Sequence, residues 1–77
     1  MNKARREQIQ KVIDQLGDLR QTIDDLCSEE QDYFDNMPEG LQDSGRGQSA
    51  EAAISALEQA SGSVDDAIQY LEEADDA

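Results

Sequence analysis

Residues 9–26, IQKVIDQLGDLRQTIDDL, carry the clearest structural signal of the chain, because their apolar residues recur at alternating steps of three and four. This period is typical of an α-helix with one apolar stripe, and its regularity defines heptads. The a positions are residues 9, 16, 23, 30 and 37, and the d positions are residues 12, 19, 26 and 33. Ile13 and Phe34 widen the stripe at e positions. The pattern predicts a long helix whose a and d residues meet a partner helix.

The rest of the chain predicts a second helix packed antiparallel to the first. The first helix is expected over residues 4–37, where Pro38 stops it. A proline and three glycines predict a loop over residues 38–48. Ser49 is the predicted N-cap of a helix over residues 49–75, whose alanine-rich stripe also steps by three and four. The fold class is therefore all-α, a single domain over residues 1–77 built as a long helical hairpin with coiled-coil heptads.

The composition of residues 61–63, Ser-Gly-Ser, leaves two interpretations of the second helix open. A glycine followed by a serine and two aspartates is typical of one helix ending and another beginning. The apolar stripe nevertheless keeps its register across these residues. We favour one continuous helix, with a helix split near residues 61–63 as the alternative.

A chain of 77 residues buries a small core, and Cys27 alone cannot form an internal disulfide. Small domains without such staples rely on regular helix packing or on oligomerisation. We therefore expect the hairpins to form a homodimer. Partial disorder of the isolated chain is a further hypothesis, because the charge is high and the apolar content low.

The chain is strongly acidic, with 19 acidic against 6 basic residues and a net charge of −13. Five of the basic residues lie in residues 1–20, whereas residues 21–77 hold sixteen acidic residues and only Arg46. Such a surface repels nucleic acid and anionic membranes, so we expect neither as a direct partner. Solubility alone is the alternative explanation of the acidity. The polar start and the lone cysteine favour a cytoplasmic location.

Several kinds of chemistry lack their usual residues. The chain has no histidine, which removes the commonest general acid–base and a frequent metal ligand. Cys27 therefore has no histidine to activate it as a nucleophile. We expect a protein that is not an enzyme, with no catalytic residues, no metal site and no cofactor.

The strongest candidate for a binding site is the segment Asp24–Asp43, which holds eight carboxylates and no basic residue. Its carboxylate density resembles the phosphates of one nucleic-acid strand, so it could serve as a decoy for a basic cleft. An aromatic patch rimmed by acids would provide an apolar anchor. The predicted partner-binding residues are Glu29, Glu30, Asp32, Tyr33, Phe34, Asp35 and Met37. The alternatives are a solvated helix face, and aromatic residues that only cover the end of the core.

The chain resembles short acidic helical proteins of phages and integrative elements of Gram-positive bacteria. The basic start at residues 3–6, the heptad helix, the Tyr-Phe-Asp-Asn-Met-Pro stretch at residues 33–38 and the Ala/Leu/Glu second helix carry this resemblance. It implies an anti-defence role, in which an inhibitor blocks a host DNA-acting enzyme through its basic nucleic-acid-binding cleft. The alternative from another class is a structural coiled-coil oligomerisation module with no enzymatic target.

Overall fold

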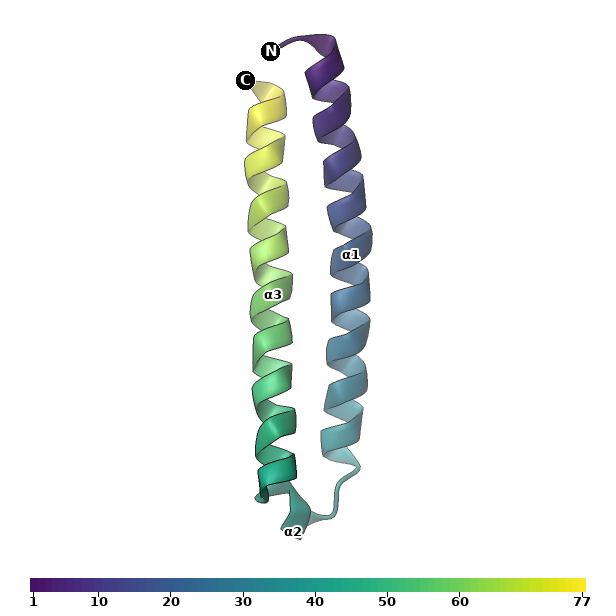
Figure 1. The fold of residues 1–77 in the computed structure, drawn as a ribbon, viewed down its shortest axis with the longest axis vertical. Coiled ribbons are helices and arrows are strands. Elements are labelled where there is room, and N and C mark those ends of the chain that lie inside the picture. Colours follow the sequence, from purple (N-terminus) through teal and green to yellow (C-terminus); the bar gives the residue numbers. More distant parts are fainter.

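A computed structural model describes all residues 1–77 as an elongated helical hairpin (Figure 1). Its elements are α1 (Lys3–Asp35), the single-turn helix α2 (Glu39–Gln42) and α3 (Gly45–Asp76). The molecule measures 58 × 15 × 12 Å, and both termini lie at the end opposite α2. The predicted all-α hairpin is therefore confirmed.

Helix α1 begins and ends close to the predicted residues. The side-chain Oδ1 of Asn2 accepts a hydrogen bond of 2.8 Å from the backbone N–H of Arg5, which caps the first turn. The helix ends at Asp35, two residues before the predicted end. Pro38 disfavours helical geometry in the residue before it, so Met37 lies outside the helix.

The predicted loop over residues 38–48 is wrong, because most of this segment is helical. The chain forms α2 directly after Pro38, and α3 already begins at Gly45 with Ser44 at the N-cap position. Ser49, the predicted N-cap, lies in the second turn of α3. The glycines at positions 45 and 47 suggested a loop, but no glycine of the chain has a positive φ. Their role here is different from a left-handed turn.

Gly47 allows the start of α3 to approach the backbone of α2. A Cβ atom at this position would lie 2.0 Å from the carbonyl oxygen of Gln42, so no larger residue fits without movement. The side chain of Gln42 also closes the turn. Its Nε2 donates hydrogen bonds of 3.2 Å to the carbonyl oxygen of Phe34 and 3.5 Å to that of Met37. The first bond adds to the one that the Phe34 carbonyl already accepts from the backbone N–H of Met37, and the second gives the Met37 carbonyl a partner.

Helix α3 runs without a break through residues 61–63, which confirms the continuous helix. Ser61 does not cap a new helix. Its hydroxyl instead donates a hydrogen bond of 2.7 Å across the hairpin to Oδ1 of Asp24. Gly62 has a helical backbone and open space around it, so nothing at this position ends the helix.

The seam between α1 and α3 uses a different pair of heptad positions from those predicted. Apart from Gly17, the half-buried residues of α1 occupy the a and e positions: Ile9, Ile13, Leu16, Arg20, Ile23, Cys27, Glu30 and Phe34. The d residues Val12, Leu19, Leu26 and Tyr33 are exposed by 41%, 56%, 47% and 47%. The predicted a/d seam is therefore wrong. A single antiparallel partner covers only a narrow strip of a helix, and the e residues take the place of the d residues in that strip.

Buried residues are confined to the end of the hairpin near α2. Met37, Gly47, Ala50 and Ile54 are the only ones, and no large side chain is fully enclosed. The small residues Gly47 and Ala50 at the start of α3 allow close packing at this end. Toward the termini the seam is only half-buried.

Candidate functional site

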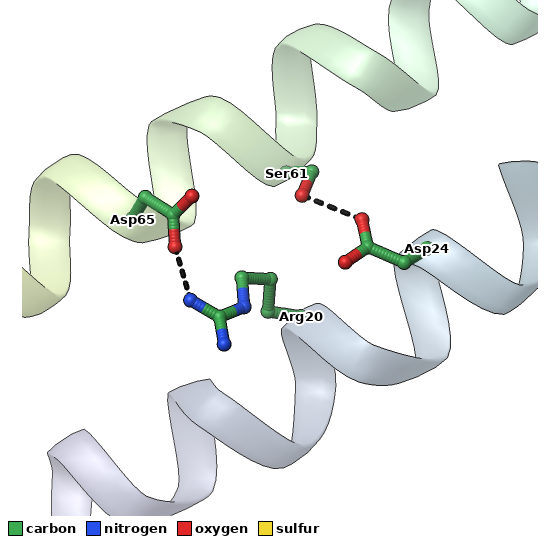
Figure 2. A network of polar contacts seen from close by, with 4 residues as sticks. All are labelled: Arg20, Asp24, Ser61 and Asp65. Atoms are coloured by element: carbon green, nitrogen blue, oxygen red, sulfur yellow. Dashed lines mark hydrogen bonds and ion pairs between the residues drawn. The ribbon is translucent and has the colours of Figure 1, made fainter.

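A polar network joins the two helices on one face near the middle of the hairpin (Figure 2). Arg20 of α1 pairs with Asp65 of α3, and one turn away Asp24 accepts the hydrogen bond from Ser61. The hydrogen bond and the negative charge of Asp65 raise the pKa of the Arg20 guanidinium, and Asp24 adds a smaller effect in the same direction. We call the side of the hairpin that carries these four residues the polar face.

The antiparallel arrangement divides the charge between the two ends of the hairpin. The basic residues of 1–20 lie beside the acidic residues of the second half of α3, and Arg6 donates a hydrogen bond of 3.0 Å to the carbonyl oxygen of Ala77. Residues 21–61, which we call the turn half, hold ten carboxylates against Arg46 alone. The turn half therefore has a net charge of −9 out of −13, and none of its side chains forms an ion pair.

The structure does not bring the predicted partner-binding residues onto one surface. Met37 is buried, and Phe34 and Glu30 lie half-buried in the seam, so they point toward α3. Tyr33 and Glu29 are exposed. The aromatic patch is split, and Tyr33 is its only largely exposed member.

Asp32 and Asp35 are exposed on the outward side of α1, away from the seam. Asp35 accepts a hydrogen bond of 2.9 Å from Gln31 one turn earlier, whereas no hydrogen bond involves the carboxylate of Asp32. Asp32 follows Asp25 by one heptad, so the two carboxylates form a row along this side. The acidic surface predicted for this segment is thus present in part, formed by aspartates that point outward.

Glu30 occupies an a position without an ionic partner. Arg46, which could have folded back toward it, forms no ion pair. Glu30 is only half-buried, so water reaches its carboxylate and the desolvation cost of a buried charge is avoided. Cys27, one turn earlier, lies in the same seam with its Sγ 3.9 Å from the carbonyl oxygen of Ile54. Both residues belong to the packing between α1 and α3.

Two carboxylates that the sequence did not single out extend the acidic surface onto α3. Glu51 and Glu58 precede Asp65 by fourteen and seven residues, which places them on the same side of α3 as Asp65. They therefore lie on the polar face of the turn half, both exposed. Their signal in the sequence was the heptad spacing from Asp65, which becomes informative once the pairing of Asp65 with Arg20 is known.

The surface has no pocket, and no group of three or more potential ligands is placed to hold a metal ion. None of the helices combines the length and apolar character needed to cross a bilayer. What the hairpin presents is a long convex surface with charge concentrated at one end. Such a surface is suited to contact with another macromolecule.

Comparison of the chain with known protein families, curated proteins and solved structures finds no match. An interpretation of its function therefore depends on its own charges and geometry.

Proposed function

We propose that this hairpin is a binding protein whose turn half occupies the basic nucleic-acid-binding cleft of another protein, a DNA-acting enzyme, and so inhibits it. The single observation that supports the proposal is the uncompensated charge of −9 in the turn half. The rest of the molecule, with its basic N-terminal residues, holds only the remaining −4.

The spacing of these charges is close to that of a nucleic-acid strand. The turn half takes up about half of the 58 Å axis, so its net charge is one per about 3 Å. A single DNA strand carries one phosphate per ~3.4 Å, and a duplex one per ~1.7 Å. A cleft that binds one strand therefore fits the charge density better than a duplex-binding surface.

The outward carboxylates of both helices would form the contact surface. We assign the main role to Asp25 and Asp32 on α1 and to Glu51 and Glu58 on α3, which are all exposed. Each is free of ion pairs, so binding to a basic cleft breaks no internal salt bridge.

The test is capture of proteins from bacterial lysate on the tagged hairpin, followed by competition with single-stranded DNA. In one variant Asp25, Asp32, Glu51 and Glu58 become amides. In a matched control Asp66, Glu72, Glu73 and Asp76 near the other end become amides, so both have the same net charge. We expect the parent and the control to retain a nucleic-acid enzyme that single-stranded DNA displaces. The first variant should not retain it. Equal loss from both would indicate a response to net charge alone and would contradict the proposal.

The second candidate function is a structural module that only oligomerises. The exposed Leu19 and Leu26 favour it, because apolar residues at heptad spacing are typical of helix–helix contacts. A hairpin that self-associates, captures no other protein and is indifferent to the amide changes would establish this function instead.

A further inference from the structure

A row of apolar side chains runs along α1 outside the seam. Val12, Leu19, Leu26 and Tyr33 follow one another at intervals of seven residues, and between two-fifths and three-fifths of each is exposed. Together they extend over more than five turns of the helix. Scattered exposed apolar residues are ordinary, but a continuous row of this length marks an interaction surface.

The hairpin places this row beside a row of alanines on α3. Two residues of the polar network, Asp24 and Asp65, directly follow the seam residues Ile23 and Val64, and both lie on the polar face. Leu26 and Ala67 come three positions after the same seam residues, and this spacing places them on the opposite flank of each helix. Because the helices are antiparallel, these flanks also share one face. That face, here called the uncharged face, consists of Val12, Leu19, Leu26, Tyr33, Ala53, Ala60, Ala67 and Ala74.

Charge is almost absent along both long edges of the uncharged face, whose two rows end at Arg5 on α1 and at Arg46 on α3. The flanking positions on α1 hold Gln8, Gln15, Thr22 and Glu29, and those on α3 hold Ser49, Ala56, Ser63 and Tyr70. Glu29 is the only charged residue among them, in a chain with 25 charged residues in all. An acidic protein that needed only solubility would have no reason to keep one side free of charge.

The exposed area of the molecule is larger than that of a compact monomer. A monomeric protein of 8.5 kDa exposes about 4,650 Å² according to the usual scaling with mass, whereas this chain exposes 5505 Å². The excess is close to the ~800 Å² that each partner buries in a stable protein–protein interface. A partner on the uncharged face would bring the burial to the level expected of a folded protein of this size.

We propose that a second copy of this chain covers the uncharged face, giving a four-helix dimer. The polar network fixes the axial register of the two helices, because Arg20 lies beside Asp65 and Asp24 lies beside Ser61. With a two-fold axis parallel to the helices, each large residue of α1 meets an alanine of the other copy's α3. The four contacts are Val12 with Ala74, Leu19 with Ala67, Leu26 with Ala60, and Tyr33 with Ala53.

A second copy fits this face better than an unrelated helix would. A two-fold interface requires one patch that complements itself, and large residues on one helix facing small residues on the other meet that requirement. All neighbouring helices of the dimer would be antiparallel. The polar face would stay outside on both copies, with its carboxylates in water. The dimer does not depend on the function proposed above.

The first experiment is sedimentation equilibrium of the full chain over a range of concentrations. The parent is expected to have twice the 8.5 kDa mass of the chain. Leu19→Gln and Ala60→Gln, on the two helices of the uncharged face, should each raise the dissociation constant at least about tenfold, because the two-fold symmetry removes the same central contact twice. Ala52 is also exposed but lies outside this face, so Ala52→Gln is the matched control and should leave the dissociation constant unchanged. Helical circular dichroism would confirm that each variant is folded.

The second experiment tests the arrangement by cross-linking, in chains that carry Cys27→Ser. A mixture of Leu26→Cys and Ala60→Cys chains should form a disulfide-linked dimer on mild oxidation. A mixture of Leu19→Cys and Leu26→Cys chains should not. Preferential linkage of the second mixture would overturn the arrangement, and a parent mass of 8.5 kDa at every concentration would overturn the dimer itself. Added salt should strengthen the dimer, because it screens the repulsion between two chains of charge −13. Added salt should instead weaken binding of the hairpin to a basic cleft. The failure of one proposal is therefore distinguishable from the failure of the other.

Discussion

Arg20 of α1 and Asp65 of α3 form the only ion pair that connects the two long helices, and they do so across the middle of the hairpin. The pair fixes the axial register of the two antiparallel helices. It also marks the polar face, on which the helices are held by hydrogen bonds and charge. The opposite face has no interaction of this kind.

The first prediction concerns this pair and pH. Pairing with Asp65 raises the pKa of Arg20 in the folded protein above its value in the unfolded chain. The pair therefore stabilises the fold fully at any pH below the unfolded pKa of arginine, and this stabilisation is lost only as the pH rises through the higher folded pKa. We therefore expect Asp65→Asn to lower the thermal midpoint slightly, by an amount that stays constant between about pH 7 and about pH 10. Asp66→Asn, which removes an unpaired carboxylate, is the control. A difference that disappears at alkaline pH would contradict the assignment.

The second prediction concerns Gly47. Gly47→Ala would place a Cβ 2.0 Å from the carbonyl oxygen of Gln42, so the start of α3 must move away from α2. We expect a loss of about 1–3 kcal/mol in the free energy of unfolding, as for other overpacked sites. Gly17→Ala is the control, because nothing lies within 4 Å of its added Cβ. That substitution should stabilise α1 by about 1 kcal/mol, so urea unfolding should shift the two variants in opposite directions.

The third prediction separates the seam from the uncharged face. At concentrations low enough for the monomer, Ile54→Ala should cost about 2–5 kcal/mol, because Ile54 is buried between the helices. Leu26→Ala should cost the monomer much less, because nearly half of Leu26 is already in water. The measurement is chemical unfolding of both variants at the same dilution. An equal loss would mean that the d residues belong to the seam after all.

The fourth prediction concerns the side chain of Gln42. Gln42→Ala removes two hydrogen bonds to carbonyl oxygens at the end of α1, those of Phe34 and Met37. We expect a loss of about 1–2 kcal/mol, because the Met37 carbonyl loses its partner, whereas the Phe34 carbonyl keeps its bond from the Met37 N–H. Faster hydrogen exchange should appear near Phe34 and Met37 but not near the termini. Uniform acceleration along the hairpin would instead indicate that Gln42 acts on the whole fold.

The hairpin itself could be predicted from the sequence, because a heptad pattern that only Glu30 interrupts and a stop at Pro38 leave little choice of secondary structure. The turn could not. Glycines at positions 45 and 47 are typical of loops, but in this turn Gly47 allows two backbones to come close, a requirement that depends on α2 being present. Ser61 was ambiguous for a similar reason, since its role depends on Asp24, which lies on the other helix.

The candidate site was predictable only in composition. The sequence shows where carboxylates are dense, but the direction of each depends on which strip of α1 faces α3. A shift of the seam from a/d to a/e turned Phe34 inward and left Leu26 outside. The same shift separated the polar face from the uncharged face. Glu51 and Glu58 joined the acidic surface through the fold, because they lie far from Asp25 and Asp32 along the chain.

Binding of a basic cleft by the carboxylates of the turn half makes the affinity for the captured partner dependent on salt, and this dependence is the measurement to make. We expect the affinity of the parent to fall steeply with salt concentration. When Asp25, Asp32, Glu51 and Glu58 are amides, we expect a weaker affinity and a shallower slope, because fewer charge contacts are then made. Equal affinities and slopes for the parent and this variant would contradict binding through these carboxylates.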